Sequence, residues 1–353
     1  MHASFVCSPV LHLCITPNLS NPPNLIQPLI ITNHHHDCQD CRRCWCKFLS
    51  SFTITRTDFC NQASGNVGTP VVQALLDAGF SVTAITRENS KSTFSPAVQV
   101  RRADLSSVSS VTAAFAGHDA VVVTIATSEV GNQNVLADAA VAAGVRRFVP
   151  SEFGHNTARL SGPLAILLAD KAQTAAYLTT LSEKNPSFSW TGVATSPFFD
   201  WGLDNGVFGV ALRDRTVRII DSGDEPVSAS TLAFVGRSVA AVLGREDEAV
   251  RNKVVDVVEF TVSQNQIVGL LEELTGQSFQ RTYIKGADLA RSADDKLAKG
   301  DYGGAFIDAL LAWNFIAGGN NAVPDSETAN GLLGLQSEDL RKVLEDYVKT
   351  RSA

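Results

Sequence analysis

The chain has 353 residues, of which 44% are hydrophobic and 18% are charged, so it can bury a full core in one large domain or two smaller ones. Its net charge of −7, with a pI near 5.5 and no basic stripe, argues against nucleic acid and anionic membranes as partners. We therefore expect a soluble cytoplasmic protein, either a monomer or a homodimer, with a small-molecule partner.

The first sixty residues differ in composition from the rest of the chain. They contain all seven cysteines and five of the seven histidines. They show neither the period of a helix nor that of a strand. We therefore expect residues 1–60 to be an irregular extension, disordered or non-native, such as non-coding sequence translated in front of a genuine exon.

Two other interpretations of this extension stay open. Cys38, Cys41 and Cys44 are spaced like zinc ligands, but a structural zinc module normally separates two ligand pairs by a dozen or more residues. A targeting peptide is the other alternative, although residues 10–15 include His12 and no basic residue precedes them. Neither pattern is complete, and we expect no metal site.

A regular pattern begins with the glycine-containing turn at residues 63–70. It opens a helix that we expect to run through Leu76 and to end at Gly79. Gly65 permits close backbone approach to a pyrophosphate, Gly68 permits the helix to pack on its strand, and the helix N-terminus supplies amide donors. The residues expected to bind a dinucleotide here are Ser64, Gly65, Asn66, Val67 and Gly68.

The second strand, expected at residues 80–86, is followed by Arg87. An acidic residue at this position would bind the adenosine ribose and favour NAD, whereas Arg87, with Lys91 nearby, suits a 2′-phosphate. The sequence therefore predicts NADP(H) as the cofactor. The alternative is an ordinary solvated arginine at a strand end.

Strands and helices then alternate at short intervals. We expect strands at 98–104, 120–125 and 145–149, and helices at 108–115 and 132–143. This alternation is typical of an α/β fold with a Rossmann-type, doubly wound parallel sheet. Asp104 is expected near the adenine, and Ala126 and Thr127 on the nicotinamide side.

The start of this pattern has a defect. The first glycine of the fingerprint would fall at position 62, which is Gln62. Residues 52–60 have some β-propensity, but Arg56 and Asp58 stand where a central strand wants Val or Ile. Either this stretch is a poor first strand, or the first strand is missing. A missing central strand would expose two sheet edges and put stability and cofactor binding in doubt.

The run Pro-Ser-Glu-Phe-Gly at 150–154, followed by Lys171 in a long helix, makes the resemblance specific. With the 65–68 turn, Arg87 and residues 196–199, the chain resembles the NmrA-like, isoflavone reductase-like group. That group includes the phenylcoumaran benzylic ether reductases and is an atypical branch of the short-chain dehydrogenases. The resemblance extends from about Ser64 to the C-terminus.

The resemblance implies that Lys171 is a general acid or base and that Ser151 and Phe153 lie at the cofactor. No Tyr-x-x-x-Lys occurs in the chain, so the usual catalytic pair of short-chain dehydrogenases is absent. A lysine beside a mostly apolar pocket loses solvation, which lowers its pKa toward neutrality. The alternative is that Lys171 contacts ribose hydroxyls or lies on a solvated helix face.

His155, next to this run, and Glu152, within it, have expected roles as well. His155 is a possible acid or base, with an ordinary loop histidine as the more common alternative. Glu152 is expected to fix the loop through backbone bonds.

Residues 61–195 are expected to form the cofactor domain, and 196–353 a smaller α+β substrate lobe with some return to the sheet. The lobe should contain strands at 216–220, 254–260 and 279–284, a helix at 231–243, and a last helix from Ser337 to Val348. A segment at 303–319 could close over the pocket as a lid or helix.

Aromatic residues cluster just after residue 195. They form either the wall of a substrate site or ordinary core. The residues that we expect to contact the substrate are Phe198, Phe199 and Trp201, with Phe208 in the same cluster.

Three functions follow from these patterns. The first is an NADPH-dependent reductase of a small aromatic or phenolic compound, with Lys171 as acid or base. The second is a non-catalytic sensor that binds NADP and signals its redox state to a protein partner. The third is a zinc-dependent interaction module fused to the reductase.

Overall fold

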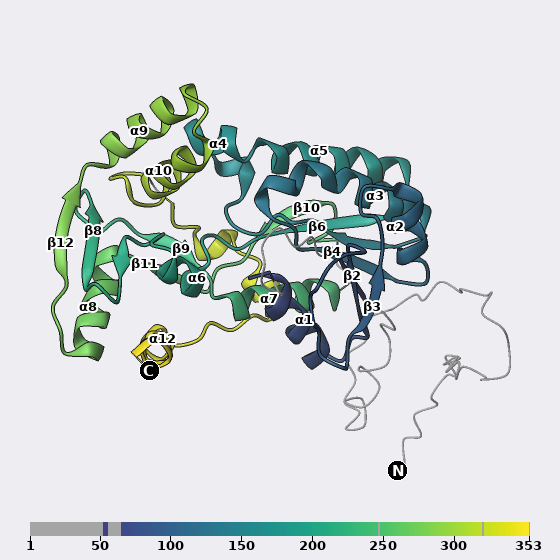
Figure 1. Ribbon diagram of the computed structural model, residues 1–353, viewed down its shortest axis with the longest axis horizontal. Coiled ribbons are helices and arrows are strands. Elements are labelled where there is room, and N and C mark those ends of the chain that lie inside the picture. The colour runs from purple at the N-terminus through teal and green to yellow at the C-terminus, as the bar shows by residue number, and fades with distance from the viewer. Residues whose placement is uncertain (1–51, 56–64, 246–247, 320, 353) are drawn as a thin grey trace, which may run out of the picture. The chain divides into compact units, whose positions relative to one another are not determined.

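A parallel sheet forms the centre of the fold in the computed structural model, which describes residues 52–55, 65–245, 248–319 and 321–352 (Figure 1). Within these residues, seven strands follow the order β10-β6-β5-β4-β1-β2-β3, and every neighbouring pair is parallel. The strands are β1 (Phe52–Thr55), β2 (Val82–Thr86), β3 (Gln99–Arg102), β4 (Ala120–Val123), β5 (Arg147–Val149), β6 (Ser189–Ala194) and β10 (Lys253–Asp256). The expected Rossmann-type architecture is confirmed.

Helices cover both faces of this sheet (Figure 1). One face packs against α1 (Gly68–Asp77) and α7 (Leu232–Leu243), and the other against α2 (Val108–Phe115), α3 (Gln133–Ala142) and α5 (Ala169–Lys184). Side chains of β4 alternate between the two cores, with Val122 in the first and Val121 and Val123 in the second. Gly236 lets α7 approach α1 closely, because a Cβ there would lie 2.4 Å from the carbonyl oxygen of Pro70.

The strand β1 lies in the centre of the sheet, between β2 and β4. Ile54 is in register with Ala84 on one side and with Val122 on the other. The strand β1 falls within the range expected to be an irregular extension. The sheet therefore begins earlier in the chain than the composition suggested, and its first strand comes from the stretch with weak β-propensity. Residues 1–51, with the cysteine and histidine run, and 56–64, with Gln62 and Ser64, lie outside the described residues.

A second lobe is built around smaller sheets. Its strands are β7 (Val210–Ala211), β8 (Thr216–Ile220) and β12 (Gln280–Ile284), which pair in the order β12-β8-β7, and β9 (Val227–Ala229), which pairs with β11 (Phe260–Val262). Its helices are α4 (Gly162–Leu167), α6 (Phe199–Asp204), α8 (Gln264–Thr275), α9 (Gly286–Ala298), α10 (Tyr302–Phe315) and α12 (Leu340–Ser352). Short connecting helices are η3 (Thr127–Asn132), η4 (Thr157–Arg159), η5 (Asp325–Glu327) and α11 (Asn330–Leu333).

Residue 195 is the expected boundary between the two lobes, but segments before it and after it cross into the opposite lobe. Leu164, in α4, and the adjacent Leu168 pack into the core of the second lobe, although both precede that residue. In the opposite direction, β10 follows it and joins the main sheet. The lobes therefore share several connections, and the segments that cross between them approach the carboxyl ends of the strands.

The last helix begins later than the sequence indicated. It starts at Leu340, and the Asp339 carboxylate accepts a hydrogen bond from the Lys342 amide at 2.9 Å. The prediction that Ser337 caps this helix is therefore wrong. Asp339 is the cap, because its carboxylate lies three residues before the helix amide that donates to it, which is the usual capping geometry.

Candidate active site

A large cavity lies at the carboxyl ends of β2, β3 and β4. Its volume is about 930 Å³, and its lining includes Arg87 after β2, Asp104 after β3 and Ile125 after β4. In a doubly wound sheet, dinucleotides bind in the crevice outside these strand ends. Arg87 and Asp104 are therefore brought together as the sequence indicated, and we call this space the cofactor cavity.

The loop that follows β2 is held in place by Arg102 on β3. The Arg102 guanidinium donates hydrogen bonds to the carbonyl oxygens of Ser90 at 2.8 Å, Glu88 at 3.0 Å and Arg87 at 3.4 Å. This anchoring presents the Arg87 side chain to the cavity. Lys91 is exposed and is not part of the cavity lining, so the geometry supports Arg87 more strongly than Lys91 as a phosphate ligand.

The turn before α1 leaves backbone donors available. Among the described residues, no side chain caps the first turn of this helix, at whose N-terminus Val67 stands. Uncapped amides and the positive end of the helix dipole form an anion-binding site. Gly65, Asn66, Val67 and Gly68 are all in the described turn, whereas Ser64 precedes it.

Asp104 is tied to its own loop. Its carboxylate accepts hydrogen bonds from the Ser106 hydroxyl at 2.6 Å and the Ser106 amide at 3.0 Å. These bonds lower the pKa of Asp104. The carboxylate is therefore ionised at neutral pH and fixed at the rim of the cofactor cavity.

Ser151 is bonded to Ile125, which lines the cavity, but is not itself in the lining. Its hydroxyl donates to the Ile125 carbonyl at 3.0 Å, and its amide donates to Gln133 Oε1 at 2.9 Å. Gln133 is fully buried, and its Nε2 has no hydrogen-bond partner among the described residues. Sequence analysis missed Gln133, whose only signal is a polar residue at the start of an otherwise apolar helix. Ala126 and Thr127 lie exposed at the start of η3, next to this group.

Lys171 is buried at the N-terminal end of α5. Its Nζ donates a hydrogen bond to the Phe153 carbonyl oxygen at 2.6 Å. Burial lowers the pKa of Lys171, while the charge of the nearby Glu152 carboxylate acts in the opposite direction. The solvated-face alternative is wrong, because Lys171 is only 6% exposed.

Glu152 is also buried, and burial raises its pKa while Lys171 and a hydrogen bond from the Thr157 hydroxyl lower it. That bond, from Thr157 Oγ1 to Glu152 Oε1, is 3.1 Å long. The carboxylate therefore ties the loop to Thr157, in addition to the backbone bond that the Glu152 amide donates to the Pro150 carbonyl at 2.8 Å.

The turn around Gly154 links the ends of β5 and β6. Gly154 has φ of 112°, a conformation that a side chain would strain. Its amide donates to Thr195 Oγ1 at 3.1 Å, and its carbonyl accepts from the amides of Thr195 and Ser196 at 2.8 and 3.0 Å. Ser196 itself has φ of 56°, and such non-glycine outliers concentrate at functional sites. These bonds fix the Phe153 carbonyl against Lys171.

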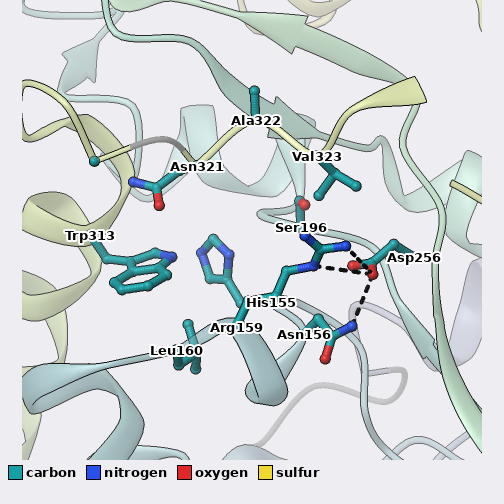
Figure 2. Close-up of a pocket in the computed structure, with 11 residues that line it drawn as sticks. His155, Asn156, Arg159, Leu160, Ser196, Asp256, Trp313, Asn321, Ala322 and Val323 are labelled. Carbon is teal, nitrogen blue, oxygen red and sulfur yellow. Dashed lines mark hydrogen bonds and ion pairs between the residues drawn. The ribbon is translucent and has the colours of Figure 1, made fainter. Parts of the chain in front are cut away.

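A second cavity, of about 290 Å³, opens beside this turn (Figure 2). It is lined by His155, Asn156, Arg159, Leu160, Ser196, Asp256, Trp313, Gly319, Asn321, Ala322 and Val323. We call it the substrate cavity because it is the candidate site for a substrate. Most of its side chains are polar, whereas the mostly apolar pocket expected beside Lys171 stays a prediction, since Lys171 is not in this lining.

The charged groups of the substrate cavity are paired with one another. Asp256 accepts hydrogen bonds from Asn156 at 2.9 Å and from the Arg159 guanidinium at 3.1 Å (Figure 2). Arg159 also pairs with Glu327 at 2.8 Å. Its positive charge is therefore matched by two carboxylates.

His155 stands in the middle of the substrate cavity, between Trp313 and Arg159 (Figure 2). Burial and the charge of Lys171 lower its pKa to about 4, against a smaller opposing effect of Asn314. The ring is neutral at neutral pH. It lies in a loop and lines this cavity, and a role as acid or base stays a prediction.

The aromatic cluster after β6 is mainly core. Phe199 and Phe208 are fully buried, with ring centroids 5.3 Å apart. Phe199 is therefore a core residue, which corrects its expected contact with the substrate. Phe198 and Trp201 are partly buried and are not in the cavity lining; the aromatic side chain that lines the cavity is Trp313, in the segment expected to act as a lid or helix.

The described part of the chain contains no group of three or more side chains placed to hold a metal ion. None of its helices is both long and apolar enough to cross a membrane.

Sequence comparisons identify relatives of this chain. A family model described as "NmrA-like family" matches residues 60–300. The oxidoreductase aprR of Aspergillus flavus is 33% identical over 294 residues, which cover 81% of this chain and 97% of that protein. The oxidoreductase poxI of Penicillium oxalicum is 30% identical over 288 residues, which cover 80% of this chain and 91% of the relative.

Solved structures share the fold. An isoflavone reductase superimposes with a TM-score of 0.66 at 19% identity and covers 84% of this chain and 100% of its own. The complex of leucoanthocyanidin reductase with NADPH from Vitis vinifera has a TM-score of 0.67 at 17% identity, over 84% of this chain and 99% of its own. At these sequence identities, the comparisons show only that the fold is shared.

Proposed function

Because this chain belongs to the NmrA-like family, we propose that it is an NADP(H)-dependent oxidoreductase that reduces a small aromatic or phenolic compound. One observation carries the proposal. The buried ammonium of Lys171 is held on the Phe153 carbonyl between the turn that lines the substrate cavity and η3, which borders the cofactor cavity. Gly131 of η3 supports this placement, because a Cβ there would lie 3.1 Å from Asp170, the neighbour of Lys171.

The residues present fit a phosphorylated dinucleotide. Arg87 would hold the 2′-phosphate, and the uncapped amides before α1 would hold the pyrophosphate. The cofactor, when bound, supplies the hydride. The names of relatives as oxidoreductases and of a structural neighbour as an NADPH complex agree with this assignment.

Lys171 can supply the proton for reduction. Its lowered pKa makes proton loss easier than for an exposed lysine, and the Phe153 carbonyl orients its Nζ. His155 is a poor donor at neutral pH, because its pKa of about 4 leaves it unprotonated. The structure thus favours Lys171 over His155 as the acid.

The full chain, incubated with NADPH and a panel of aromatic aldehydes, ketones and quinones, tests the proposal. We expect loss of NADPH absorbance with at least one class and a matching amount of reduced product. NADPH binding without turnover across the panel would favour the non-catalytic sensor. Absence of NADPH binding would overturn the cofactor assignment.

Replacing Arg87 with alanine should separate the two nicotinamide cofactors. Loss of a charge-assisted phosphate contact is expected to weaken NADPH binding by about 10- to 100-fold and NADH binding by less than about 3-fold. Fluorescence titration measures both affinities. Lys299→Ala, which removes an exposed positive charge after α9, is the control and should change neither. An equal loss for both cofactors would show that Arg87 does not contact the 2′-phosphate.

A further inference from the structure

Three side chains of the substrate cavity each carry an atom that forms no hydrogen bond with the described residues. They are Arg159, Ser196 and Asp256, which all line the cavity and lie together on one side of it in Figure 2. Ser196 and Asp256 are only 6% and 7% exposed, so their polar atoms are set into the cavity wall. Polar atoms in such a place are normally completed by a ligand or by water.

The Asp256 carboxylate uses only one of its two oxygens. Its Oδ2 accepts hydrogen bonds from Asn156 Nδ2 at 2.9 Å and from Arg159 Nε and Nη2 at 3.3 and 3.1 Å. Its Oδ1 accepts none from the described residues, and it is not among the unpartnered atoms that are closed to solvent. Oδ1 is therefore an accessible acceptor in the cavity wall.

The Arg159 guanidinium has one nitrogen outside its ion pairs. Nε and Nη2 donate to Asp256, and Nη2 also donates to Glu327 Oε2 at 2.8 Å, whereas Nη1 donates to no described residue. In Figure 2 one guanidinium nitrogen is directed away from Asp256, on the side of Ser196. Because two carboxylates match the charge of Arg159, Nη1 offers a donor to an uncharged ligand and no unmatched charge to an anion.

Ser196 adds a hydroxyl to the same wall. Its Oγ forms no hydrogen bond with a described residue and is likewise not among the atoms closed to solvent. The backbone of Ser196 stays in the left-handed region, and its amide is bonded to the Gly154 carbonyl. Because this conformation is costly for a residue with a side chain, the fold places the hydroxyl here at the expense of strain.

We propose that Arg159, Ser196 and Asp256 form a subsite for an uncharged amide group on the substrate. Arg159 Nη1 and Ser196 Oγ donate to the amide oxygen, and Asp256 Oδ1 accepts from the amide N–H. Donors and acceptor lie on one side of the cavity, so the amide that fits is a primary amide or a lactam, whose C=O and N–H point the same way. The inference rests on the proposed function only in treating the ligand as a substrate.

Two other ligand groups fit these atoms less well. An ester offers the carbonyl oxygen but has no N–H for Asp256 Oδ1. A carboxylate brings a negative charge against that same oxygen, which would then be left with a repulsive neighbour. Beside the polar atoms, Trp313 and Leu160 offer apolar surface to a ring that carries the amide.

Three probes that share one ring test the subsite: benzamide, methyl benzoate and benzoate. Their binding to the full chain with NADP+ is measured by NMR titration. We expect benzamide to bind about ten-fold more tightly than either of the others, because only benzamide completes both the donors and the acceptor. Equal binding of benzamide and methyl benzoate, tighter binding of benzoate, or no binding of any probe would overturn the proposal.

Asp256→Asn separates the acceptor from the donors. Asn156 and Arg159 both donate to the Oδ2 position, so they keep the oxygen of the new side chain there and place its NH2 group where Oδ1 was. Benzamide should then bind about ten-fold more weakly, with no loss for methyl benzoate. The control is Asp325→Asn, which removes the same charge from an exposed residue outside the cavity lining and should change neither affinity.

Ser196→Ala is the second variant, and it decides the matter if Asp256→Asn does not fold. It removes a donor to the carbonyl oxygen and should weaken benzamide and methyl benzoate alike, by about three- to ten-fold. Thermal unfolding is measured first for each variant. Unchanged binding of both probes to folded Ser196→Ala, or unchanged benzamide binding to folded Asp256→Asn, would show that these atoms do not hold the ligand.

This inference and the proposed function fail in different ways. If benzamide is preferred but no carbonyl compound is reduced, the subsite stands and the reductase proposal fails. If carbonyl compounds are reduced but benzamide is not preferred, the reductase proposal stands and the subsite fails.

Discussion

Replacing Lys171 with methionine is expected to lower kcat for NADPH-dependent reduction by about 10²- to 10⁴-fold, the range for loss of a positioned general acid. Methionine keeps a long side chain in the buried space but cannot donate a proton. The affinity for NADPH should change by less than about 3-fold, because the contacts that bind the phosphates lie elsewhere. Steady-state kinetics and nucleotide titration measure the two effects separately.

The pH dependence of the rate distinguishes a catalytic role for Lys171 from a purely structural one. Reduction needs the protonated amine, so its rate should fall as pH rises through the lowered pKa of Lys171. The reverse oxidation needs the neutral amine and should accelerate over the same range. Lys171→Met should remove this dependence from both directions. The control is Lys184→Ala, which removes an exposed lysine at the end of the same helix and should leave the rates and their pH dependence unchanged. A similar loss of rate in both variants would rule out Lys171 as the acid.

Truncation of Phe199 to alanine is expected to destabilise the protein by about 3–5 kcal/mol, the usual cost of removing a buried phenylalanine ring. Its ring meets those of Phe208 and Phe260 at centroid distances of 5.3 and 5.4 Å, so the change leaves a cavity in the core of the second lobe. Differential scanning calorimetry should show a lower Tm. At a temperature where the variant is folded, KM should be unchanged.

Tyr283→Ala is the matched control for this prediction. Tyr283 is 67% exposed on β12, and its removal should change stability by no more than about 0.5 kcal/mol. A normal Tm for Phe199→Ala combined with a raised KM would show that Phe199 contacts substrate after all, as its position after β6 first suggested.

Much of the cofactor half could be predicted from local patterns. The helix at Val108–Phe115 has the expected bounds, and Arg87 and Asp104 line one cavity. These predictions succeed because strand and helix periods are local, and because parallel topology brings the ends of successive strands to one edge of the sheet.

The substrate half could not be predicted in the same way. His155 and Trp313 line the same cavity but lie far apart in the chain, and no local pattern relates them. The apolar character of Phe199 is equally compatible with a substrate wall and with a core. Only the packing of α6 against β9 and β11 shows that Phe199 belongs to the core.

The sequence by itself therefore determined the α/β class and, through Arg87, the preference for NADP over NAD, because both depend on residues close together in the chain. The dinucleotide turn and Lys171 as the acid, the second implied by the family resemblance, stay predictions. Tertiary structure alone decided that Phe52–Thr55 forms the central strand, that Phe199 is core and that the substrate cavity is polar. Those features depend on which distant side chains meet and which polar groups lose water, and neither is a property of a local segment.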